Sequence, residues 1–192
     1  MSNTYQASER DALLSEYDDI YLVDGRRTPF ADYCGVMREV SPIDLGIYAA
    51  RATFEHSGIP ASDVDAVIAG SVAQASFDAF MLPRHIGLYS GVKQTAPSLL
   101  VHRLCATGFE AILTAADQIK LGKAKLVLCA GAESMSRNPV ASYTQRAGFK
   151  LGQVEFGDFL WEAMIDTAPD MAMGHTAEEL AKRYDISRAE VD

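Results

Sequence analysis

The fold of this chain is decided by the stretch Ser98–Glu110, which reads SLLVHRLCATGFE. Its first part, up to Leu104, is mostly apolar and predicts a buried β-strand. Further along, apolar residues recur at helical spacing, at Phe109, Ile112, Leu113, Ala116 and Ile119. A single cysteine, Cys105, lies at the junction of the two patterns. The stretch therefore predicts a strand that runs directly into a helix, with a thiol between them.

Cys105 is a candidate nucleophile because of this position. The first backbone N–H groups of a helix carry partial positive charge, which favours a thiolate over a neutral thiol. Gly108, three residues later, has no side chain, so another molecule could approach the backbone there. A free cysteine is also among the most frequently buried residues and usually only packs. The junction alone leaves both a catalytic and a structural thiol open.

Composition argues against several classes of function. The chain has 192 residues, of which 48% are apolar and 22% charged, as is ordinary for a globular protein. Its net charge of −9 argues against a nucleic-acid partner, because phosphate binding requires a basic face. No apolar run resembles a signal peptide or approaches the length of about 18 residues that a membrane span needs.

Cysteine usage predicts reduced thiols. The three cysteines are Cys34, Cys105 and Cys129, and none forms a Cys-x-x-Cys pair. Neither a disulfide framework nor a metal site is expected from these spacings, and reduced thiols fit a cytoplasmic location. Cys129 lies in the middle of an apolar run, so we expect it to be structural.

Strand and helix signals alternate as far as residue 136. Ser41, Pro42 and Asp44 predict the start of a helix, and Gly58 predicts its end. In chain order we expect strands at 20–23, 64–70, 98–104 and 126–130, and helices at 41–57, 83–89 and 105–122. This order predicts an α/β fold with a mixed, mostly parallel sheet between helices. We expect a polar extension at 1–18 and one domain at 19–136.

The remaining part of the chain, 137–192, has a different character. Regular alternation stops after Ser136, and a mixture of aromatic, glycine and polar residues follows as far as Met173. That length predicts part of an inserted loop, or lid, domain rather than a plain connection. Ser187 and Glu190 form a capping box, which predicts a helix that starts just before the last residue, Asp192. One helical turn is not stable alone, so we expect that the chain is cut before the end of this domain or is completed by another polypeptide.

Five ordered segments resemble the thiolase family. Val101–Gly108, which reads VHRLCATG, resembles the nucleophile segment of thiolases, typically Val-Asn-x-x-Cys-x-Ser-Gly. The other four segments also stand in the order of the family: Arg27–Phe30, Ser41–Gly58 with Val64–Val72, Cys129–Ser136, and Met173–Glu178 with Tyr184–Arg188. The resemblance covers residues 20–192 and implies the N-terminal half of the thiolase fold.

The resemblance implies acyl transfer between coenzyme A and Cys105. Thiolases split or form a 3-oxoacyl-CoA, so acyl-CoA is expected as a substrate, without a permanently bound cofactor. Cys105 would carry the acyl group as a thioester, and its backbone N–H would help to hold the oxyanion. Met173 matches the methionine that borders the acyl pocket. His102 and Gly108 are candidate supports of the nucleophile.

The chain departs from the family pattern beside the nucleophile and in its extent. His102, Ala106 and Thr107 stand where asparagine, glycine and serine are usual. The family's second half carries a histidine that activates the nucleophile and a cysteine that acts as acid and base, and neither motif occurs here. The resemblance therefore implies a second thiolase chain or C-terminal half as partner, and a dimer or higher oligomer. The alternative is a non-catalytic acyl-CoA-binding or scaffolding relative. A ketosynthase-like condensing enzyme is disfavoured by the match at Met173–Glu178.

Overall fold

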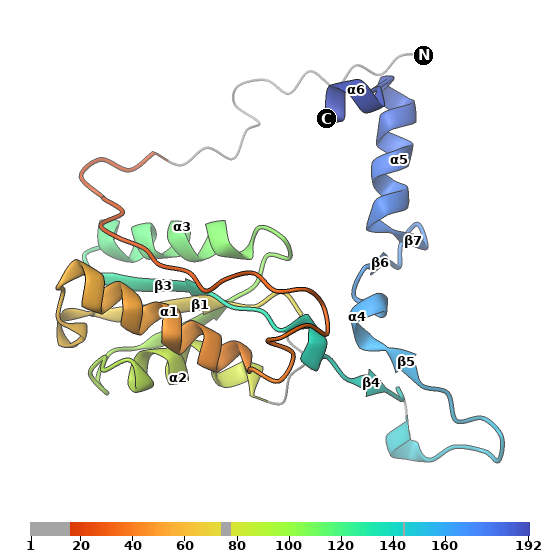
Figure 1. Cartoon of the computed structure of the whole chain (residues 1–192), viewed down its shortest axis with the longest axis horizontal. Coiled ribbons are helices and arrows are strands. Elements are labelled where there is room, and N and C mark those ends of the chain that lie inside the picture. The colour runs from red at the N-terminus through yellow and green to blue at the C-terminus, as the bar shows by residue number, and fades with distance from the viewer. Residues whose placement is uncertain (1–15, 74–77, 144) are drawn as a thin grey trace.

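A parallel β-sheet forms the centre of the molecule. The computed structural model describes residues 16–73, 78–143 and 145–192. β1 (Ala66–Gly70) lies between β2 (Ser98–Val101) and β3 (Val127–Gly131), and the last residues of the three strands are level with one another. Figure 1 shows this sheet between helices. The prediction of an α/β fold with a parallel sheet is confirmed.

The central strand is buried on both faces because helices cover both. α1 (Pro42–Ser57) and α2 (Leu82–Tyr89) lie on one side of the sheet, and α3 (Thr107–Lys120) lies on the other (Figure 1). Successive residues of a strand point to opposite faces. Val67 accordingly belongs to the apolar cluster with α1 and α2, whereas Ile68 belongs to the cluster with α3. Both side chains are almost fully buried, so β1 anchors the core.

The ends of α1 follow the signals in the sequence. Ser41 Oγ accepts a hydrogen bond from the Asp44 N–H at 3.0 Å, and Pro42 is the first helical residue. At the other end Gly58 adopts a φ of 70°, and its N–H donates to Phe54 O at 3.0 Å. A left-handed φ favours glycine, because a Cβ would be strained there. The predicted helix is confirmed.

Residues 20–23 do not form the predicted strand, so that prediction is wrong. The segment runs alongside the sheet (Figure 1), and Tyr21 and Leu22 are 76% and 80% exposed. A groove of about 390 Å³ is lined by this segment, by β3 and by residues of α1 and α3. A strand needs a hydrogen-bonded neighbour about 4.8 Å away. The groove separates residues 20–23 from β3, so the segment has no strand of the described part of the chain within hydrogen-bonding distance.

The strand and helix that flank Cys105 are both shorter than predicted. β2 ends at Val101 rather than Leu104, and α3 begins at Thr107 rather than at the cysteine. Leu104, in the loop between them, adopts a φ of 46°. A positive φ fits neither a strand nor a right-handed helix, so it separates the two elements.

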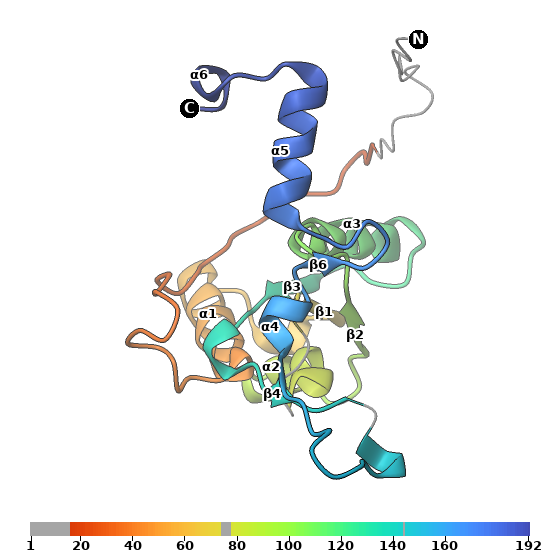
Figure 2. The same ribbon diagram turned by 90° about the vertical axis from the view of Figure 1, so that its right-hand side faces the viewer.

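Residues 137–192 extend away from the sheet as a series of short elements (Figure 1). Figure 2 looks from the side to which they extend, so α4 and α5 lie toward the viewer. Two antiparallel strand pairs are β4 (Val140–Ala141) with β5 (Gly157–Asp158), and β6 (Ile165–Asp166) with β7 (Met171–Ala172). The helices are α4 (Phe159–Glu162), α5 (Met173–Tyr184) and α6 (Arg188–Val191). Short 3₁₀ turns occupy Ala61–Asp63, Ala79–Met81, Met135–Arg137 and Gln145–Ala147. The predicted capping box is present, since the Ser187 N–H donates to Glu190 Oε2 at 2.7 Å.

The predicted extension at 1–18 falls mostly on residues 1–15, which lie outside the described residues. At its described end, the Tyr17 hydroxyl donates to Asp117 Oδ1 of α3 at 2.8 Å. Among the helices of the described part of the chain, none combines the length and the apolar content that crossing a bilayer requires.

Candidate active site

The cysteine at the strand–helix junction is accessible. Cys105 is exposed and lies two positions before Thr107, the first residue of α3. Ala106 occupies the N-cap position and has no side-chain hydrogen bond to the helix. The first N–H groups of α3 are therefore not capped by this residue, and they concentrate the positive end of the helix dipole near the thiol. The thiol thus lies beside a helix N-terminus, although it is not itself part of the helix.

One buried hydroxyl fixes the loop that carries this thiol. Thr107 is only 3% exposed. Its Oγ1 accepts a hydrogen bond from the Arg103 N–H at 2.8 Å and donates one to Leu104 O at 2.6 Å. These bonds hold the backbone around Leu104, whose positive φ is uncommon for a residue with a side chain. Serine would supply the same hydroxyl, so this departure from the family pattern keeps the support.

The end of β1 packs directly against the same threonine. A Cβ at Gly70 would overlap Thr107 Cγ2 and would lie 2.7 Å from Val101 O. Only glycine leaves room for this approach. The sequence analysis missed Gly70, although a glycine at the end of a buried strand is a signal of close backbone approach.

A carboxylate ties together the segments that follow β1 and β3. Glu133 Oε2 accepts hydrogen bonds from the Val72 N–H at 2.7 Å, the Ala73 N–H at 3.1 Å and the Ser71 hydroxyl at 3.2 Å. On the other side of this segment, His102 Nε2 lies 2.8 Å from Val72 O. The sequence analysis named His102 but gave Glu133 no role. A carboxylate just beyond a buried parallel strand is the signal that could have found it.

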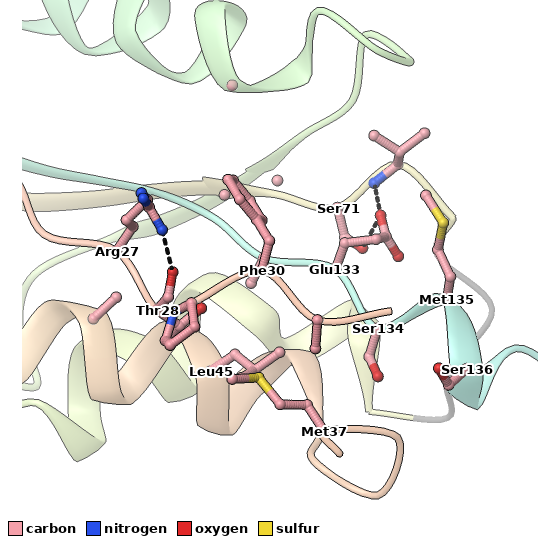
Figure 3. A pocket seen from close by; sticks show the side chains of 18 of the residues that line it. Arg27, Thr28, Phe30, Met37, Leu45, Ser71, Glu133, Ser134, Met135 and Ser136 are labelled. Atoms are coloured by element: carbon pink, nitrogen blue, oxygen red, sulfur yellow. Dashed lines mark hydrogen bonds between the residues drawn. The ribbon is translucent and has the colours of Figure 1, made fainter. Parts of the chain in front are cut away.

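An open cavity of about 510 Å³ (Figure 3) adjoins the loop of residues 102–106 that carries the candidate nucleophile, called the nucleophile loop below. It lies at the carboxyl ends of β1 and β3, and Thr107 and Gly108 in the first turn of α3 form part of its wall. A Cβ at Gly108 would meet no atom within 4 Å, so the backbone there is open to an approaching group. Further lining residues are Arg26, Arg27, Phe30, Met37, Leu45, Glu133 and Met135. A cavity of this size can hold part of a small organic ligand.

The segment before α1 supplies a cation and an aromatic ring to this cavity. The Arg27 guanidinium lies 5.0 Å from the centroid of the Phe30 ring and donates to Thr28 O at 3.1 Å. Figure 3 shows both side chains on the same wall. Phe30 is 89% exposed, so the ring offers its surface rather than filling the core.

The other two cysteines have different surroundings. Cys129 lies within β3, where its Sγ donates to Ala111 O at 3.5 Å and burial raises the pKa of the thiol to about 11. A neutral, partly buried thiol is a poor nucleophile, as expected for a structural cysteine. Cys34 is exposed in a loop, where its N–H donates to Ser136 Oγ at 2.9 Å. Neither lies beside the N-terminus of α3.

Of the predicted site residues, only Gly108 is among the described residues that line the cavity, whereas Cys105 and His102 lie beside it without lining it. Met173 lies in a separate part of the chain. It begins α5, its side chain is half-exposed, and it is not among the described residues that line the cavity. Its role beside an acyl group stays a prediction. Over residues 16–73, 78–143 and 145–192, no cluster of three or more His, Cys, Asp or Glu side chains could hold a metal ion.

Comparison with known proteins gives one consistent result. Residues 20–192 match the family described as "Thiolase, N-terminal domain". The chain is 38% identical over 174 residues to the mitochondrial 3-ketoacyl-CoA thiolase of Bos taurus, covering 90% of this chain and 44% of that protein. It is 36% identical over 174 residues to beta-ketothiolase BktB of Cupriavidus necator, covering 91% of this chain and 44% of that protein.

The fold gives the same match. The crystal structure of human mitochondrial 3-ketoacyl-CoA thiolase in complex with CoA superposes with a TM-score of 0.84 and 39% identity. The match covers 88% of this chain and 43% of that chain. The chain therefore spans less than half the length of these relatives.

Proposed function

The chain belongs to the thiolase family, and from this membership we propose that it supplies the nucleophilic cysteine of an acyl-CoA acyltransferase. The substrates are a 3-oxoacyl-CoA and coenzyme A in the direction of cleavage, and two acyl-CoA molecules in the direction of condensation. The part of the relatives that this chain does not span completes the enzyme, either as a second chain or as a C-terminal half, and we call it the second polypeptide.

The position of Cys105 carries this proposal. The thiol is exposed on a loop beside the N-terminus of α3, and Thr107 holds that loop through two hydrogen bonds. A nucleophilic thiol needs both access and a positive electrostatic surrounding, and the loop provides them. The cavity next to this loop, whose wall includes Thr107 and Gly108, leaves room for part of a small ligand. The structural alternative for Cys105 loses support because the side chain does not fill the core.

The proposed cleavage proceeds in two transfers. Cys105 gives its proton to a base, and its Sγ attacks the 3-oxo carbon of the substrate. The bond between C2 and C3 then breaks, its electron pair moves to C2, and C2 takes up a proton as acetyl-CoA leaves. The shortened acyl group remains on Cys105 as a thioester. The thiol of a second coenzyme A gives up its proton, attacks this thioester and releases Cys105 as a thiolate.

The chain supplies some of these groups, and the second polypeptide supplies the others. N–H groups near the start of α3, and that of Cys105, would hold the oxyanion of each tetrahedral intermediate. The family resemblance assigns the base to a histidine and the acid to a second cysteine, both in the second half. Met173 would border the acyl chain once residues 137–192, which we take as part of a lid domain, pack against that half.

The groove beside β3 supports the existence of this second polypeptide. β3 is an edge strand of the three-stranded sheet in the described part of the chain, so one of its edges carries unpaired N–H and C=O groups. Apolar side chains line the groove, among them Phe54 of α1 and Ile112 and Ile119 of α3. An unpaired strand edge between apolar walls is a site for an added strand. We assign this groove to the second half of the enzyme.

Hydrogen exchange tests this assignment. Binding of the second polypeptide should slow the exchange of amides at 19–26 and 127–131 together, because both line the groove. Amides of β1 serve as the control, because this strand is already paired on both edges. Protection of neither groove segment in an assembled complex would exclude the groove as the contact.

The activity test uses the chain with and without the second polypeptide. Thiolysis of acetoacetyl-CoA and of a longer 3-oxoacyl-CoA should require both polypeptides. Cys105→Ala should abolish thiolysis and leave assembly intact, whereas Cys34→Ser, at another exposed cysteine, should leave thiolysis unchanged. Full activity of the Cys105→Ala complex would refute the nucleophile. A complex that binds acyl-CoA without turning it over would instead favour a binding or scaffolding role.

We further propose that the enzyme works as a dimer or higher oligomer in a reducing compartment such as the cytoplasm. A catalytic Cys105 must remain a free thiol, which a reducing compartment ensures. Light scattering of the assembled complex tests the oligomeric state. Cell fractionation separates a cytoplasmic from a mitochondrial enzyme, the location named for the bovine relative.

A further inference from the structure

One side chain joins the nucleophile loop to the end of the central strand. His102 Nε2 lies 2.8 Å from Val72 O. A carbonyl oxygen can only accept a hydrogen bond, so Nε2 carries the proton and donates it. When the ring is neutral, Nδ1 is then the nitrogen without a proton. The contact defines both the direction of the hydrogen bond and the tautomer of His102.

The peptide that accepts this hydrogen bond is held from its other side. Glu133 Oε2 accepts the N–H groups of Val72 at 2.7 Å and Ala73 at 3.1 Å. His102 directly follows β2, Val72 follows β1, and Glu133 follows β3. Since the strands lie in the order β2, β1, β3, these contacts form a bridge across the carboxyl edge of the sheet. Val72 is thus a fixed point to which the loop is attached.

From His102 the constraint reaches Cys105 through two held peptides. The Arg103 N–H donates to Thr107 Oγ1 at 2.8 Å, and the same hydroxyl donates to Leu104 O at 2.6 Å. Cys105 is bonded directly to Leu104. The loop therefore has little freedom between the ring of His102 and the thiol, and a shift at one end moves the other.

We propose that His102 is a positioning residue for the nucleophile. Its hydrogen bond to Val72 O sets where the loop, and with it the Cys105 thiol, lies relative to the sheet edge. The inference rests on the proposed function of Cys105. The asparagine usual at this position in thiolases also carries an N–H donor on a shorter side chain, so histidine keeps the donor and extends its reach. His102 transfers no proton in the reaction.

Three variants separate the donor from the ring. His102→Gln places an amide N–H at nearly the reach of Nε2, His102→Phe keeps the ring without a donor, and His102→Ala removes both. In the full chain, we measure alkylation of Cys105 relative to the exposed Cys34 of the same molecule. The ratio of the two alkylation rates should be unchanged in the glutamine variant. In the other two variants it should shift about two- to tenfold, because the net free energy of one hydrogen bond corresponds to a rate change of that size. Equal ratios in all variants would overturn the proposal.

Kinetics of the assembled enzyme distinguish positioning from proton transfer. His102→Phe should lower kcat by about two- to tenfold with KM unchanged, because a displaced nucleophile weakens only the transition state. His102→Gln should restore kcat with an unaltered pH profile. A glutamine variant as slow as the phenylalanine variant, or one that loses a limb of the pH profile, would overturn a positioning role.

The tautomer of the unaltered chain provides a test that needs no variant to fold. Nitrogen NMR of the full chain at about pH 8, above the usual pKa of histidine, should find His102 protonated at Nε2. The Nδ1–H tautomer would overturn the proposal. The labelling and NMR results do not depend on turnover, so full activity of Cys105→Ala would refute the proposed function while leaving them interpretable.

Discussion

Replacement of Gly70 by alanine tests how closely the sheet edge packs against the nucleophile loop. The added Cβ would overlap Thr107 Cγ2 and would lie 2.7 Å from Val101 O, and both are closer than Cβ contacts found in proteins. Thr107 cannot simply rotate away, because its hydroxyl makes two hydrogen bonds and the residue is 3% exposed. Val101 belongs to the paired strand β2. We expect Gly70→Ala to lower the free energy of unfolding by about 3 kcal/mol, the upper end of the usual range for overpacking.

A second substitution, Thr107→Ser, separates the two clashes. It removes Cγ2 but keeps the hydroxyl that bonds Arg103 and Leu104. Alone it should cost about 1 kcal/mol, the loss of one buried methyl group. In the double variant the new Cβ still clashes with Val101 O but no longer with a methyl group at residue 107, so part of the penalty disappears. The double variant should therefore be more stable than the sum of the single variants by about 1 kcal/mol.

Urea denaturation of the wild-type chain, both single variants and the double variant gives this coupling free energy. Gly131→Ala is the matched control, because Gly131 ends β3 as Gly70 ends β1 and its Cβ would meet no atom within 4 Å. The control should stay within about 0.5 kcal/mol of the wild type. Two results would refute the packing argument: single-variant effects that add within about 0.5 kcal/mol, or a Gly70→Ala variant as stable as the control.

Three further outcomes follow from the structure. Gly108→Ala should raise the free energy of unfolding by about 0.5–1 kcal/mol in urea, because the residue lies in the first turn of α3 with open space around the missing Cβ; a less stable variant would contradict this. Cys129 should resist alkylation at about pH 8 in the folded chain and react after unfolding, because burial raises the pKa of its thiol to about 11 and keeps it neutral; mass spectrometry of peptides detects the difference, and rapid labelling in the folded chain would exclude it. His56→Ala should raise the pKa of Asp24, because the hydrogen bond from His56 at 2.7 Å is the main cause that holds this pKa low, whereas the pKa of Asp65, held low chiefly by a backbone N–H, should not move. Because the pKa of Asp24 is lowered in the folded state, the contact stabilises the fold fully above the ordinary aspartate pKa. This stabilisation is lost as the pH falls through the lowered pKa. NMR titration of the carboxyl groups measures the pKa of Asp24 and of Asp65.

Elements with local signals could be predicted from the sequence. α1 begins at a serine cap and a proline and ends at a glycine with positive φ, and all three are properties of single residues. β3 could be predicted because helices cover it on both faces, which requires a continuous apolar run. Cys105 could also be singled out from the sequence, because the change from strand spacing to helical spacing on either side of it is visible along the chain.

The surroundings of the thiol could not be predicted, because they depend on sheet register. Glu133 and Val72 are hydrogen-bonded although 61 positions separate them in the chain, and His102 lies 30 positions from the carbonyl that it contacts. No pattern close to Gly70 in the sequence indicates that this last residue of β1 lies against Thr107. These contacts exist because parallel strands bring their carboxyl ends to one edge, and the strand order β2, β1, β3 then decides which residues meet.

The failed prediction at residues 20–23 has a related cause. An apolar run indicates that a segment becomes buried, but it does not indicate which surface buries it. Here the run lines one wall of a groove whose other wall includes β3, and the side chains of Tyr21 and Leu22 stay mostly exposed to solvent. A strand inserted between the two would pair with the free edge of β3 and cover the exposed Tyr21 and Leu22. The strand signal at 20–23 and the unpaired edge of β3 both agree with the added strand that we propose for this groove.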